Sequence, residues 1–445
     1  MPLISHTAPE TVVAYRAGVA IPAAQFLADV ARLAAAFPPG RHIINVCADR
    51  YRFMVGFAAG VLSGRVSLLP PTHTPEVVRH LAAFAPDVFC LTDEDECDID
   101  LPRMRYPDPL APPAAGPWSV PETEADAAVA FVFTSGSSGT PLPHRKRWGR
   151  LVQCVRDGAR RLGLSQRGHA VLATVPPQHM YGFESSVLLP MLSGGALCAE
   201  RPFYPADICA LLDSIPRPRT LVTTPIHLRA LLGSHTALPK SDLIVSATAP
   251  LNQALAREAE RRFAAPLLEI YGSTESGQLA TRHTAAEREW RLWPKVRLSI
   301  ENGRAWVRGG HLEQPTPLCD ELEPTGAQGF LLHGRLTDLV NIAGKRSSLA
   351  YLTHQLNCIE GVLDGAFFLP GQSSADELGV VRVAAAAVAP DLDAARILEQ
   401  LRRRIDPVFL PRPLLLLDRL PRNSTGKLPR EALRALLEGP LRRPA

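Results

Sequence analysis

Long apolar runs are absent from this chain of 445 residues. A membrane-spanning helix needs about 18 consecutive apolar residues, and no segment reaches that length. Residues 1–6 show no charged stretch followed by an apolar one, so a secretory signal is not expected either. Together these absences predict a cytoplasmic protein without a membrane span.

Cysteine pairs with the Cys-x-x-Cys spacing are also missing, although the chain has eight cysteines. The usual ligand spacing of a zinc site is therefore absent. We expect the thiols to be reduced and mostly buried.

A strong excess of one charge is missing as well, because the formal net charge is only +4. On this ground neither nucleic acid nor a membrane surface is expected as a partner. Hydrophobic residues make up 46% and charged residues 21%, as in a soluble globular protein. One ordinary core is too small for this length, so two or more domains are expected.

Helical and strand patterns alternate through roughly the first 330 residues. Short apolar segments at 42–46, 66–69 and 88–91 predict strands, and helical patterns lie between them at 53–62 and 75–84. This alternation predicts βαβ units and an α/β fold with mainly parallel sheets and covering helices.

Two further segments carry distinct patterns. Residues 12–37 are rich in alanine with helical periodicity, which predicts a helix. Residues 296–307 alternate around an Asn-Gly pair, which predicts a β-hairpin. We expect a large N-terminal domain over 1–336 and a small mobile α+β C-terminal lid domain over 337–445.

Hydroxyl residues and glycines alternate directly after an apolar strand predicted at 128–133. The stretch reads Thr134-Ser135-Gly136-Ser137-Ser138-Gly139-Thr140-Pro141. Glycines let the backbone approach a phosphate and present N–H groups to it, and hydroxyls add donors. The stretch lacks the Gly-Lys-Ser/Thr ending of a Walker loop. A surface turn rich in serine and glycine is the alternative interpretation.

This loop is the first of several motifs that occur in one order. Downstream lie Ser246-Ala247-Thr248-Ala249, Tyr271-Gly272-Ser273-Thr274-Glu275, Asp320, Gly334-Arg335 and Asn423-Ser424-Thr425-Gly426-Lys427. As a set, they resemble the adenylate-forming superfamily of acyl- and aryl-CoA synthetases, peptide-synthetase adenylation domains and luciferases. The resemblance covers about residues 40–435.

For ATP, the resemblance implies a site built from separate segments. The implied nucleotide-binding residues are Thr134, Ser135, Gly136, Ser137, Ser138, Gly139, Ala247, Thr248, Ala249, Tyr271, Gly272, Ser273, Asp320 and Arg335. Asp320 and Arg335 would contact the ribose, since an ionised carboxylate can accept bonds from both ribose hydroxyls.

The resemblance also implies which residues carry the chemistry. Thr274 would contact the α-phosphate, and Glu275 would help to hold Mg²⁺, because a hard cation must neutralise charge where a carboxylate attacks a polyanion. Lys427 would bridge the attacking carboxylate and a phosphate oxygen. A solvated glutamate in a turn and a surface lysine are the alternative interpretations.

The acid substrate is implied to lie beside His179, Gly182 and Ser246, with Gly182 leaving room for its chain or ring. A lone histidine is more often structural than catalytic. A loop of small residues is also simply a turn between a strand and a helix.

The implied reaction has two steps. A carboxylic acid and ATP give an acyl-adenylate and pyrophosphate, and a phosphopantetheine thiol of CoA or an acyl carrier protein then displaces AMP. The lid would turn between the steps and present a different face to each. ATP, Mg²⁺ and the thiol are therefore expected at the site, and a small carboxylic acid and an acyl carrier protein are the expected partners.

The chain departs from the family pattern at two places. Leu142 stands where members usually carry a lysine that contacts pyrophosphate, and Thr337 stands at the usual hinge position, with Asp338 next. Positive charge arrives slightly after Leu142, in the run His144-Arg145-Lys146-Arg147. This run either takes over the phosphate contact or is simply solvated.

The compact N-terminal domain, Leu142 and the Pro-His-Arg-Lys run resemble the AMP-ligases associated with aryl-polyene and xanthomonadin-type pigment pathways. That resemblance implies a hydroxybenzoate-like aromatic acid and an acyl carrier protein as acceptor. Three alternatives stay open: a fatty acyl-CoA ligase, a non-catalytic nucleotide-binding protein with a degraded site, and a phosphotransferase that would release ADP.

Overall fold

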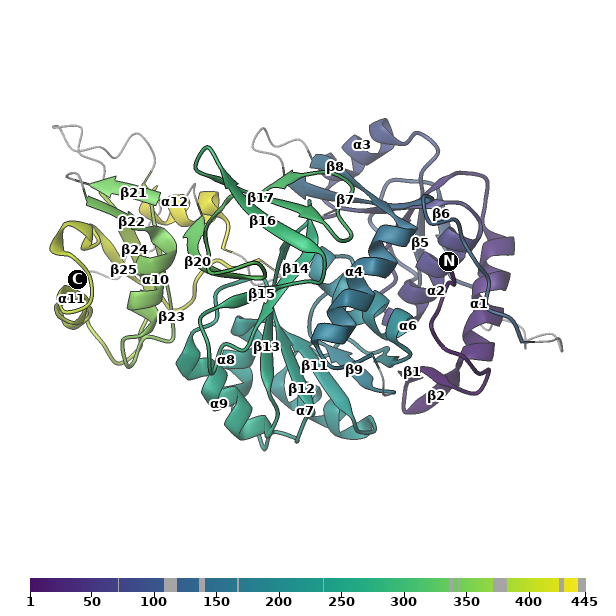
Figure 1. Ribbon diagram of the computed structural model, residues 1–445, viewed down its shortest axis with the longest axis horizontal. Helices are drawn as coiled ribbons and strands as arrows, with labels where there is room; N and C mark the ends of the chain where they lie inside the picture. Colours follow the sequence, from purple (N-terminus) through teal and green to yellow (C-terminus); the bar gives the residue numbers. More distant parts are fainter. Residues whose placement is uncertain are drawn as a thin grey trace.

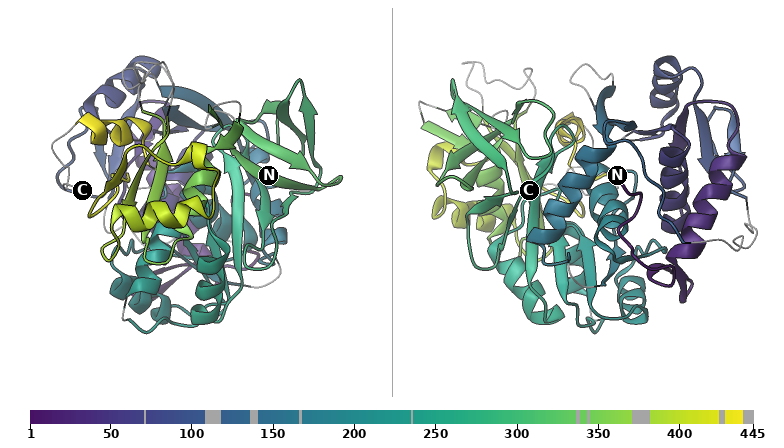
Figure 2. Two further views of the ribbon diagram at one scale, coloured as in Figure 1. Left: turned by 90° about the vertical axis from the view of Figure 1, so that its left-hand side faces the viewer. Right: turned by 45° about the vertical axis from the view of Figure 1, so that its right-hand side comes forward.

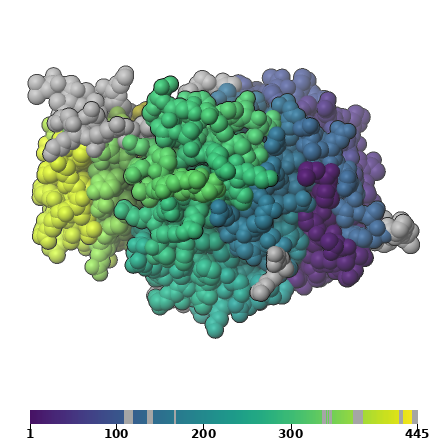
Figure 3. Space-filling model, viewed as in Figure 1, coloured from purple at the N-terminus to yellow at the C-terminus, as the bar shows by residue number. Residues whose placement is uncertain are grey.

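The computed structural model describes most of the chain. The described residues are 1–70, 72–107, 118–135, 141–165, 168–234, 236–335, 339–342, 345–370, 382–423 and 428–438. Figures 1 and 3 show that the N-terminal residues (purple) and the C-terminal residues (yellow) lie at opposite ends of an elongated molecule, with the teal and green central residues between them.

A six-stranded sheet forms the N-terminal end, with the order β6-β5-β3-β4-β7-β8. Its strands are β3 (His42–Asn45), β4 (Val66–Leu69), β5 (Phe89–Thr92), β6 (Arg103–Arg105), β7 (Ala128–Ser135) and β8 (Pro141–Arg147). All its pairs are parallel except the β7–β8 hairpin. The crossover helices are α2 (Arg50–Leu62) and α3 (Pro75–Phe84), so the predicted βαβ units are confirmed here.

An eleven-stranded sheet fills the centre, with the order β19-β20-β15-β14-β13-β12-β11-β9-β10-β1-β2. Its parallel core consists of β1 (Val12–Arg16), β10 (Ala196–Cys198), β9 (Ala170–Ala173), β11 (Arg219–Thr223), β12 (Leu243–Ser246) and β13 (Leu267–Ser273). Antiparallel strands extend both edges: β2 (Val19–Pro22), β14 (Gly277–Arg282), β15 (Trp290–Leu292), β19 (Asp320–Pro324) and β20 (Gly329–Arg335).

The predicted helix over 12–37 is wrong in its first half. Residues 12–22 form the β1–β2 hairpin, and the helix α1 spans only Ala23–Ala36. The hairpin turn is made by Ala17 and Gly18, whose φ angles are 48° and 75°. Two successive positive φ angles are typical of the tight turns that match strand twist, and alanine composition hid this signal. The predicted hairpin near 300 is confirmed as β16 (Val296–Glu301) and β17 (Arg304–Gly309); the two-residue β18 (Thr316–Pro317) pairs with β17.

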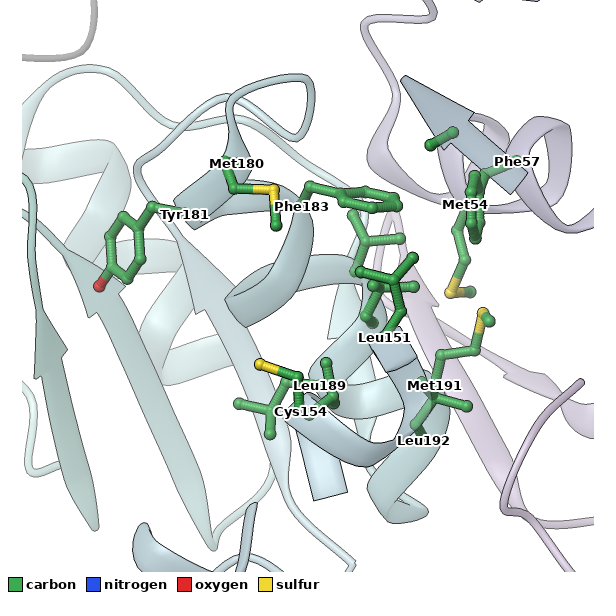
Figure 4. Close-up of a cluster of buried hydrophobic side chains, with 14 of the residues drawn as sticks. Met54, Phe57, Leu151, Cys154, Met180, Tyr181, Phe183, Leu189, Met191 and Leu192 are labelled. Carbon is green, nitrogen blue, oxygen red and sulfur yellow. The ribbon is translucent and has the colours of Figure 1, made fainter. Parts of the chain in front are cut away.

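The helices of the central region pack between and around the two sheets. They are α4 (Trp148–Arg161), α5 (Met180–Gly182), the π-helix η1 (Phe183–Leu188), α6 (Leu189–Ser193), α7 (Pro205–Ser214), α8 (Pro225–Gly233) and α9 (Gln253–Phe263). Every residue from 180 to 192 is buried. This segment therefore belongs to the core, and Figure 4 shows the Phe183 ring beside Phe57 of α2 and near Leu151 of α4; the ring centroids of Phe183 and Phe57 lie 4.8 Å apart.

The C-terminal residues form a smaller unit with its own core, which lies in front of the central sheet in the left view of Figure 2. Its elements are β21 (Leu339–Ile342), β22 (Lys345–Ser348), α10 (Leu349–Asn357), β23 (Asp364–Phe368), β24 (Ala384–Val388), α11 (Ala394–Arg402), the 3-10 helix η4 (Pro407–Phe409), β25 (Leu414–Leu416) and α12 (Arg430–Glu438). This small α+β unit agrees with the predicted fold class. The predicted boundary falls within 336–338, outside the described residues.

Two expectations from composition can be compared with the structure. All eight cysteines are free, and five of them are buried. Within the described parts of the chain, no helix combines the length and the apolar character needed to cross a membrane.

Candidate active site

The pentapeptide at 271–275 forms the end of β13 and the turn into β14. The hydroxyls of Ser273 and Ser276 lie 3.0 Å apart, and the Ser276 N–H donates to Ser273 Oγ at 3.2 Å. These hydrogen bonds stabilise the turn. Gly272 is required by space, because a Cβ there would lie 2.3 Å from a carbonyl oxygen of the facing strand. The turn thereby presents Thr274 and Glu275 where the parallel strands of the sheet end.

Tyr271 and Asp320 meet although they are far apart in sequence. The Tyr271 hydroxyl donates to Asp320 Oδ2 at 2.6 Å. The Tyr271 ring is held between Trp290 and Phe330, with ring centroids 5.7 and 5.5 Å away. Asp320 opens β19 and lies opposite Arg335 of β20 in the antiparallel register. The fold thus places the residues implied for the nucleoside on neighbouring strands, although the Arg335 side chain lies outside the described atoms.

The small-residue loop follows β12, which is the parallel neighbour of β13. Ser246 is fully buried, and its hydroxyl has no hydrogen-bond partner among the residues that the structure describes. Thr248 has a φ angle of 82°, in the left-handed region that β-branched residues rarely adopt. A buried hydroxyl without a partner and a strained backbone at the carboxyl ends of parallel strands are both typical of a ligand site.

On the acid side, His179 is half-buried and directly precedes α5. Gly182 has a different role from the expected one: a Cβ there would lie 2.0 Å from the carbonyl oxygen of Pro176. Its missing side chain therefore permits close backbone packing. The neighbouring Tyr181 is buried and donates to the Val245 carbonyl at 2.9 Å, and Figure 4 shows its ring beside the strands, away from the other labelled side chains.

The β7–β8 hairpin brings the phosphate loop to the pentapeptide. Thr134 Oγ1 lies 3.0 Å from His144 Nε2, and the same nitrogen lies 3.8 Å from Glu275 Oε1. The Lys146 ammonium donates to the carbonyl oxygen of Thr274 at 2.5 Å. Three segments thus converge within hydrogen-bond or ion-pair distance. Gly136, Ser137, Ser138, Gly139 and Lys427 lie outside the described residues, as does the side chain of Ser135.

The basic run divides between the two faces of β8, because side chains alternate along a strand. His144 and Lys146 face the pentapeptide. Arg145 and Arg147 pair with Glu313 instead, at 3.5 and 3.2 Å. Lys146 is therefore the cation of this run that contacts the pentapeptide, whereas Arg145 and Arg147 line the adjoining cavity beside Glu313. Leu142, at the position of the usual family lysine, is 52% exposed.

The charges at the turn suit a cation that is held partly by phosphates. Burial acts to raise the pKa of Glu275, but hydrogen bonds from its own N–H and from Ser273, with the charges of His144 and Lys146, hold that pKa below its usual value. Glu275 is therefore ionised at neutral pH. Within the described residues, no group of three His, Cys, Asp or Glu side chains could hold a metal by itself. A single carboxylate fits Mg²⁺, which is commonly bound by one or two carboxylates together with substrate phosphates and water.

A cavity of about 260 Å³ adjoins this turn. Its lining includes Glu275 and Ser276 from the turn, Lys146 from β8, Met180 next to His179, and His311. Its further lining residues include Leu151, Cys154, Glu184, Gly277 and Glu313.

Glu184 and His311 were not predicted as site residues. Glu184 is the single charged residue in the largely apolar segment 180–192, and that contrast is a signal in the sequence. His311 gives no comparable signal, because only the tertiary fold brings the loop after β17 to the cavity.

The sequence matches a known family and several known proteins over most of its length. The profile of the AMP-binding enzyme family matches residues 6–317. A 4-coumarate–CoA ligase of Rhodobacter capsulatus is 32% identical over 271 residues, which is 61% of this chain and 67% of that protein. A 4-coumarate–CoA ligase of Halorhodospira halophila is 31% identical over 66% of this chain and 73% of its own. A 4-chlorobenzoate–CoA ligase of an Arthrobacter species is 25% identical over 69% and 66%.

Solved structures share the fold. ATP-bound MatB from Rhodopseudomonas palustris superposes with a TM-score of 0.81 at 18% identity, covering 98% of this chain and 99% of that one. The O-succinylbenzoate CoA synthetase of Bacillus subtilis in complex with AMP gives a TM-score of 0.80 at 18% identity, covering 98% and 97%.

Proposed function

The chain belongs to the AMP-binding enzyme family and is an AMP-forming acid–thiol ligase, and from this premise we propose that it activates a hydroxybenzoate-like aromatic acid. The observation that carries the proposal is the cavity of about 260 Å³ beside Glu275. Small-molecule sites usually enclose roughly 300–1,000 Å³, so a cavity of this size suits a single-ring acid better than a long acyl chain. Relatives named as 4-coumarate and 4-chlorobenzoate CoA ligases support an aromatic acid.

In this proposal the nucleotide lies across the ends of β12 and β13. Ser246 and Thr248 would border the acid and the adenine, and Asp320 would accept bonds from the ribose. Thr134 and the loop after it would hold the phosphates. Glu275 would hold Mg²⁺, which neutralises charge at phosphorus when bound.

The first step needs a cation between the acid and the α-phosphate. Lys427 has this role in the proposal, and Lys146 adds a fixed positive charge beside Thr274 and Glu275. Charge that is already in place when the transition state forms lowers the barrier without reorganisation. In the second step, a phosphopantetheine thiol attacks the acyl carbon and AMP leaves. We propose CoA or an acyl carrier protein as the source of this thiol.

The test is pyrophosphate release with a panel of benzoic, cinnamic and fatty acids. We expect release with one or more hydroxylated aromatic acids and little with long-chain acids. Release of ADP would instead indicate a phosphotransferase. No pyrophosphate with any acid, from protein that binds ATP, would indicate a non-catalytic nucleotide-binding protein. Supplying CoA and a phosphopantetheinylated carrier protein separately then identifies the acceptor.

A further inference from the structure

We propose that Glu184 is a specificity-determining residue of the acid pocket, and that together with His311 it selects acids that carry a hydroxyl group remote from the carboxylate. The inference rests on the proposed function, because it concerns what the same pocket recognises. It goes beyond that function by assigning the selection to two side chains.

Glu184 presents a buried carboxyl group to the cavity. Its side chain belongs to a residue only 2% exposed, at the start of the π-helix η1. Cys154 Sγ lies 3.6 Å from Oε1, and the backbone N–H of Gln278 donates to the carboxylate. These are few partners for a buried charge, and burial accordingly raises the pKa of Glu184 to about 7. A π-helical turn inside a helix often marks a functional site.

Gly277 keeps the space beside this carboxyl group open. Its φ angle is 70°, and a Cβ added there would lie 3.0 Å from Glu184 Oε1 and 3.4 Å from His311 Nε2. Both groups therefore lie close to the same point on the cavity wall.

His311 lines the same cavity, and its ring carries a buried hydrogen-bond acceptor. Its Nε2 lies 2.8 Å from the Ser276 carbonyl oxygen, so Nε2 carries the hydrogen. Burial lowers the pKa of His311 to about 4, so the ring is neutral at pH 7 and Nδ1 has a lone pair. His311 is 6% exposed, and within the described residues Nδ1 has no hydrogen-bond partner. A buried acceptor without a partner is costly unless a ligand supplies one.

When Glu184 is ionised, its carboxylate and the Nδ1 lone pair of His311 are both hydrogen-bond acceptors in the wall of one cavity. An ammonium group is disfavoured, because Lys146 already acts on Glu184 with its positive charge. A neutral hydroxyl can donate its single hydrogen to one of these acceptors without adding a second cation. Sites built to bind a substrate hydroxyl discriminate strongly against the analogue that lacks it, because their polar groups are then left unpaired.

The experiment compares matched pairs of acids in pyrophosphate release: benzoate with 3-hydroxybenzoate and 4-hydroxybenzoate, cinnamate with 4-coumarate, and 3-methoxybenzoate as an acid of similar shape without the donor. For the wild type we expect kcat/KM to favour at least one hydroxylated acid by about 10- to 100-fold, as for a hydrogen bond to a charged group. Glu184→Leu should reduce that ratio to within about three-fold of unity, with KM for ATP unchanged. Glu184→Gln keeps a carbonyl acceptor and should give an intermediate ratio.

Glu313→Gln is the matched control, because Glu313 lines the same cavity but pairs with Arg145 and Arg147. It should keep the wild-type selectivity ratio. The proposal is overturned if folded Glu184→Leu retains that ratio, or if it alters only KM for ATP, which would place the phosphates in this cavity. Calorimetric binding of benzoate and 3-hydroxybenzoate distinguishes a failure of the Glu184 proposal from a failure of the proposed reaction. Equal binding of the two acids overturns the role of Glu184, whereas selective binding without pyrophosphate release supports it and contradicts the proposed reaction.

Discussion

At the scale of single residues, the lysine at position 146 is unusual for this chain. The chain has 48 basic residues, but only five of them are lysines. Arginine offers a planar fork of donors, whereas lysine offers a compact point charge. The Lys146 ammonium donates to the carbonyl oxygen of Thr274, and the negative charge of Glu184 acts on it. We predict that Lys146 is the cation that compensates for Leu142.

Removing this charge should weaken the use of ATP. We expect Lys146→Met to raise KM for ATP at least about ten-fold, since a charge-assisted contact is worth roughly 1.5–3 kcal/mol. Arg145→Gln should change KM for ATP only slightly, because Arg145 pairs with Glu313 whereas Lys146 contacts the pentapeptide. Steady-state kinetics of both variants at saturating acid provides the comparison. Equal effects of the two substitutions would show that the run acts as a diffuse basic patch.

Glu184 should also make stability depend on pH in a defined direction. Its pKa is raised from 4.5 to about 7 in the folded protein, so the unfolded chain ionises first as pH rises. The folded state therefore loses stability between about pH 4.5 and pH 7. At about 1.4 kcal/mol per unit of pKa, the full shift corresponds to roughly 3–4 kcal/mol. On the order of 2–3 kcal/mol of this is lost between pH 5 and pH 8.

Glu184→Gln cannot ionise and should not show this loss. We expect the difference between the unfolding free energies at pH 5 and pH 8 to be smaller in the variant than in the wild type by that amount. Denaturant titrations at the two pH values measure it, and titration of all other groups cancels in the comparison. The same pH dependence in both proteins would mean that Glu184 is ionised at pH 5 in the folded state.

At the scale of elements, the site depends on the hairpins that follow parallel strands. Residues that are contiguous in sequence and follow a strand could be predicted, because parallel strands end at one edge: 271–275 and Ser246 are such cases. The hydrogen bond between Tyr271 and Asp320, and the approach of Glu184 and His311 to Gly277, could not be predicted, since each joins elements that only the tertiary fold brings together.

The errors at this scale have physical reasons as well. The β1–β2 hairpin was taken for part of a helix because alanine favours helices while Ala17 and Gly18 form a tight turn. The split of the basic run between two faces follows from β8 being a strand, and four charged or polar residues in a row carry no hydrophobic alternation that would predict one.

At the scale of the whole molecule, one carboxylate joins the C-terminal unit to the central region. Asp364 of β23 accepts hydrogen bonds at 2.7 Å from Nε and from Nη2 of Arg422, five residues before Lys427 in the sequence. It also lies 3.3 Å from Nη1 of Arg229 on α8. Any rotation of the C-terminal unit must break the second contact and can keep the first.

Loss of the Arg229 contact should therefore affect the rates of acyl-adenylate formation and thiol transfer differently. We expect Arg229→Ala to change the rate of acyl-adenylate formation and the rate of thiol transfer in opposite directions, each by about two- to five-fold, since such an ion pair is worth roughly 0.5–1 kcal/mol. Asp364 keeps Arg422 as its partner, so the fold should persist. Single-turnover measurements of each step provide the test, and a parallel change in both would contradict a rotating lid.

Lys427→Ala is a second test of whether the C-terminal unit rotates between the two steps. Adenylation should fall by several orders of magnitude, because a positioned charge acts mainly in the transition state. Thiol transfer from preformed acyl-adenylate should persist, because in the rotated arrangement Lys427 has left the site. Equal loss of both steps in folded protein would mean that one arrangement of the domains serves both.

The hydrogen bond between Tyr271 and Asp320 has a consequence for the choice of sugar. One oxygen of the Asp320 carboxylate accepts from the phenol, which fixes the orientation of the carboxyl group. A preference for ribonucleotides over deoxyribonucleotides would then depend on an aromatic side chain that need not touch the sugar. The expected outcome is that the wild type uses ATP much better than 2′-deoxy-ATP, and that Tyr271→Phe narrows this preference while adenine selectivity stays the same. Comparing kcat/KM for ATP, 2′-deoxy-ATP and GTP in both proteins would show whether the Tyr271 hydroxyl is responsible for the preference for ribose over deoxyribose.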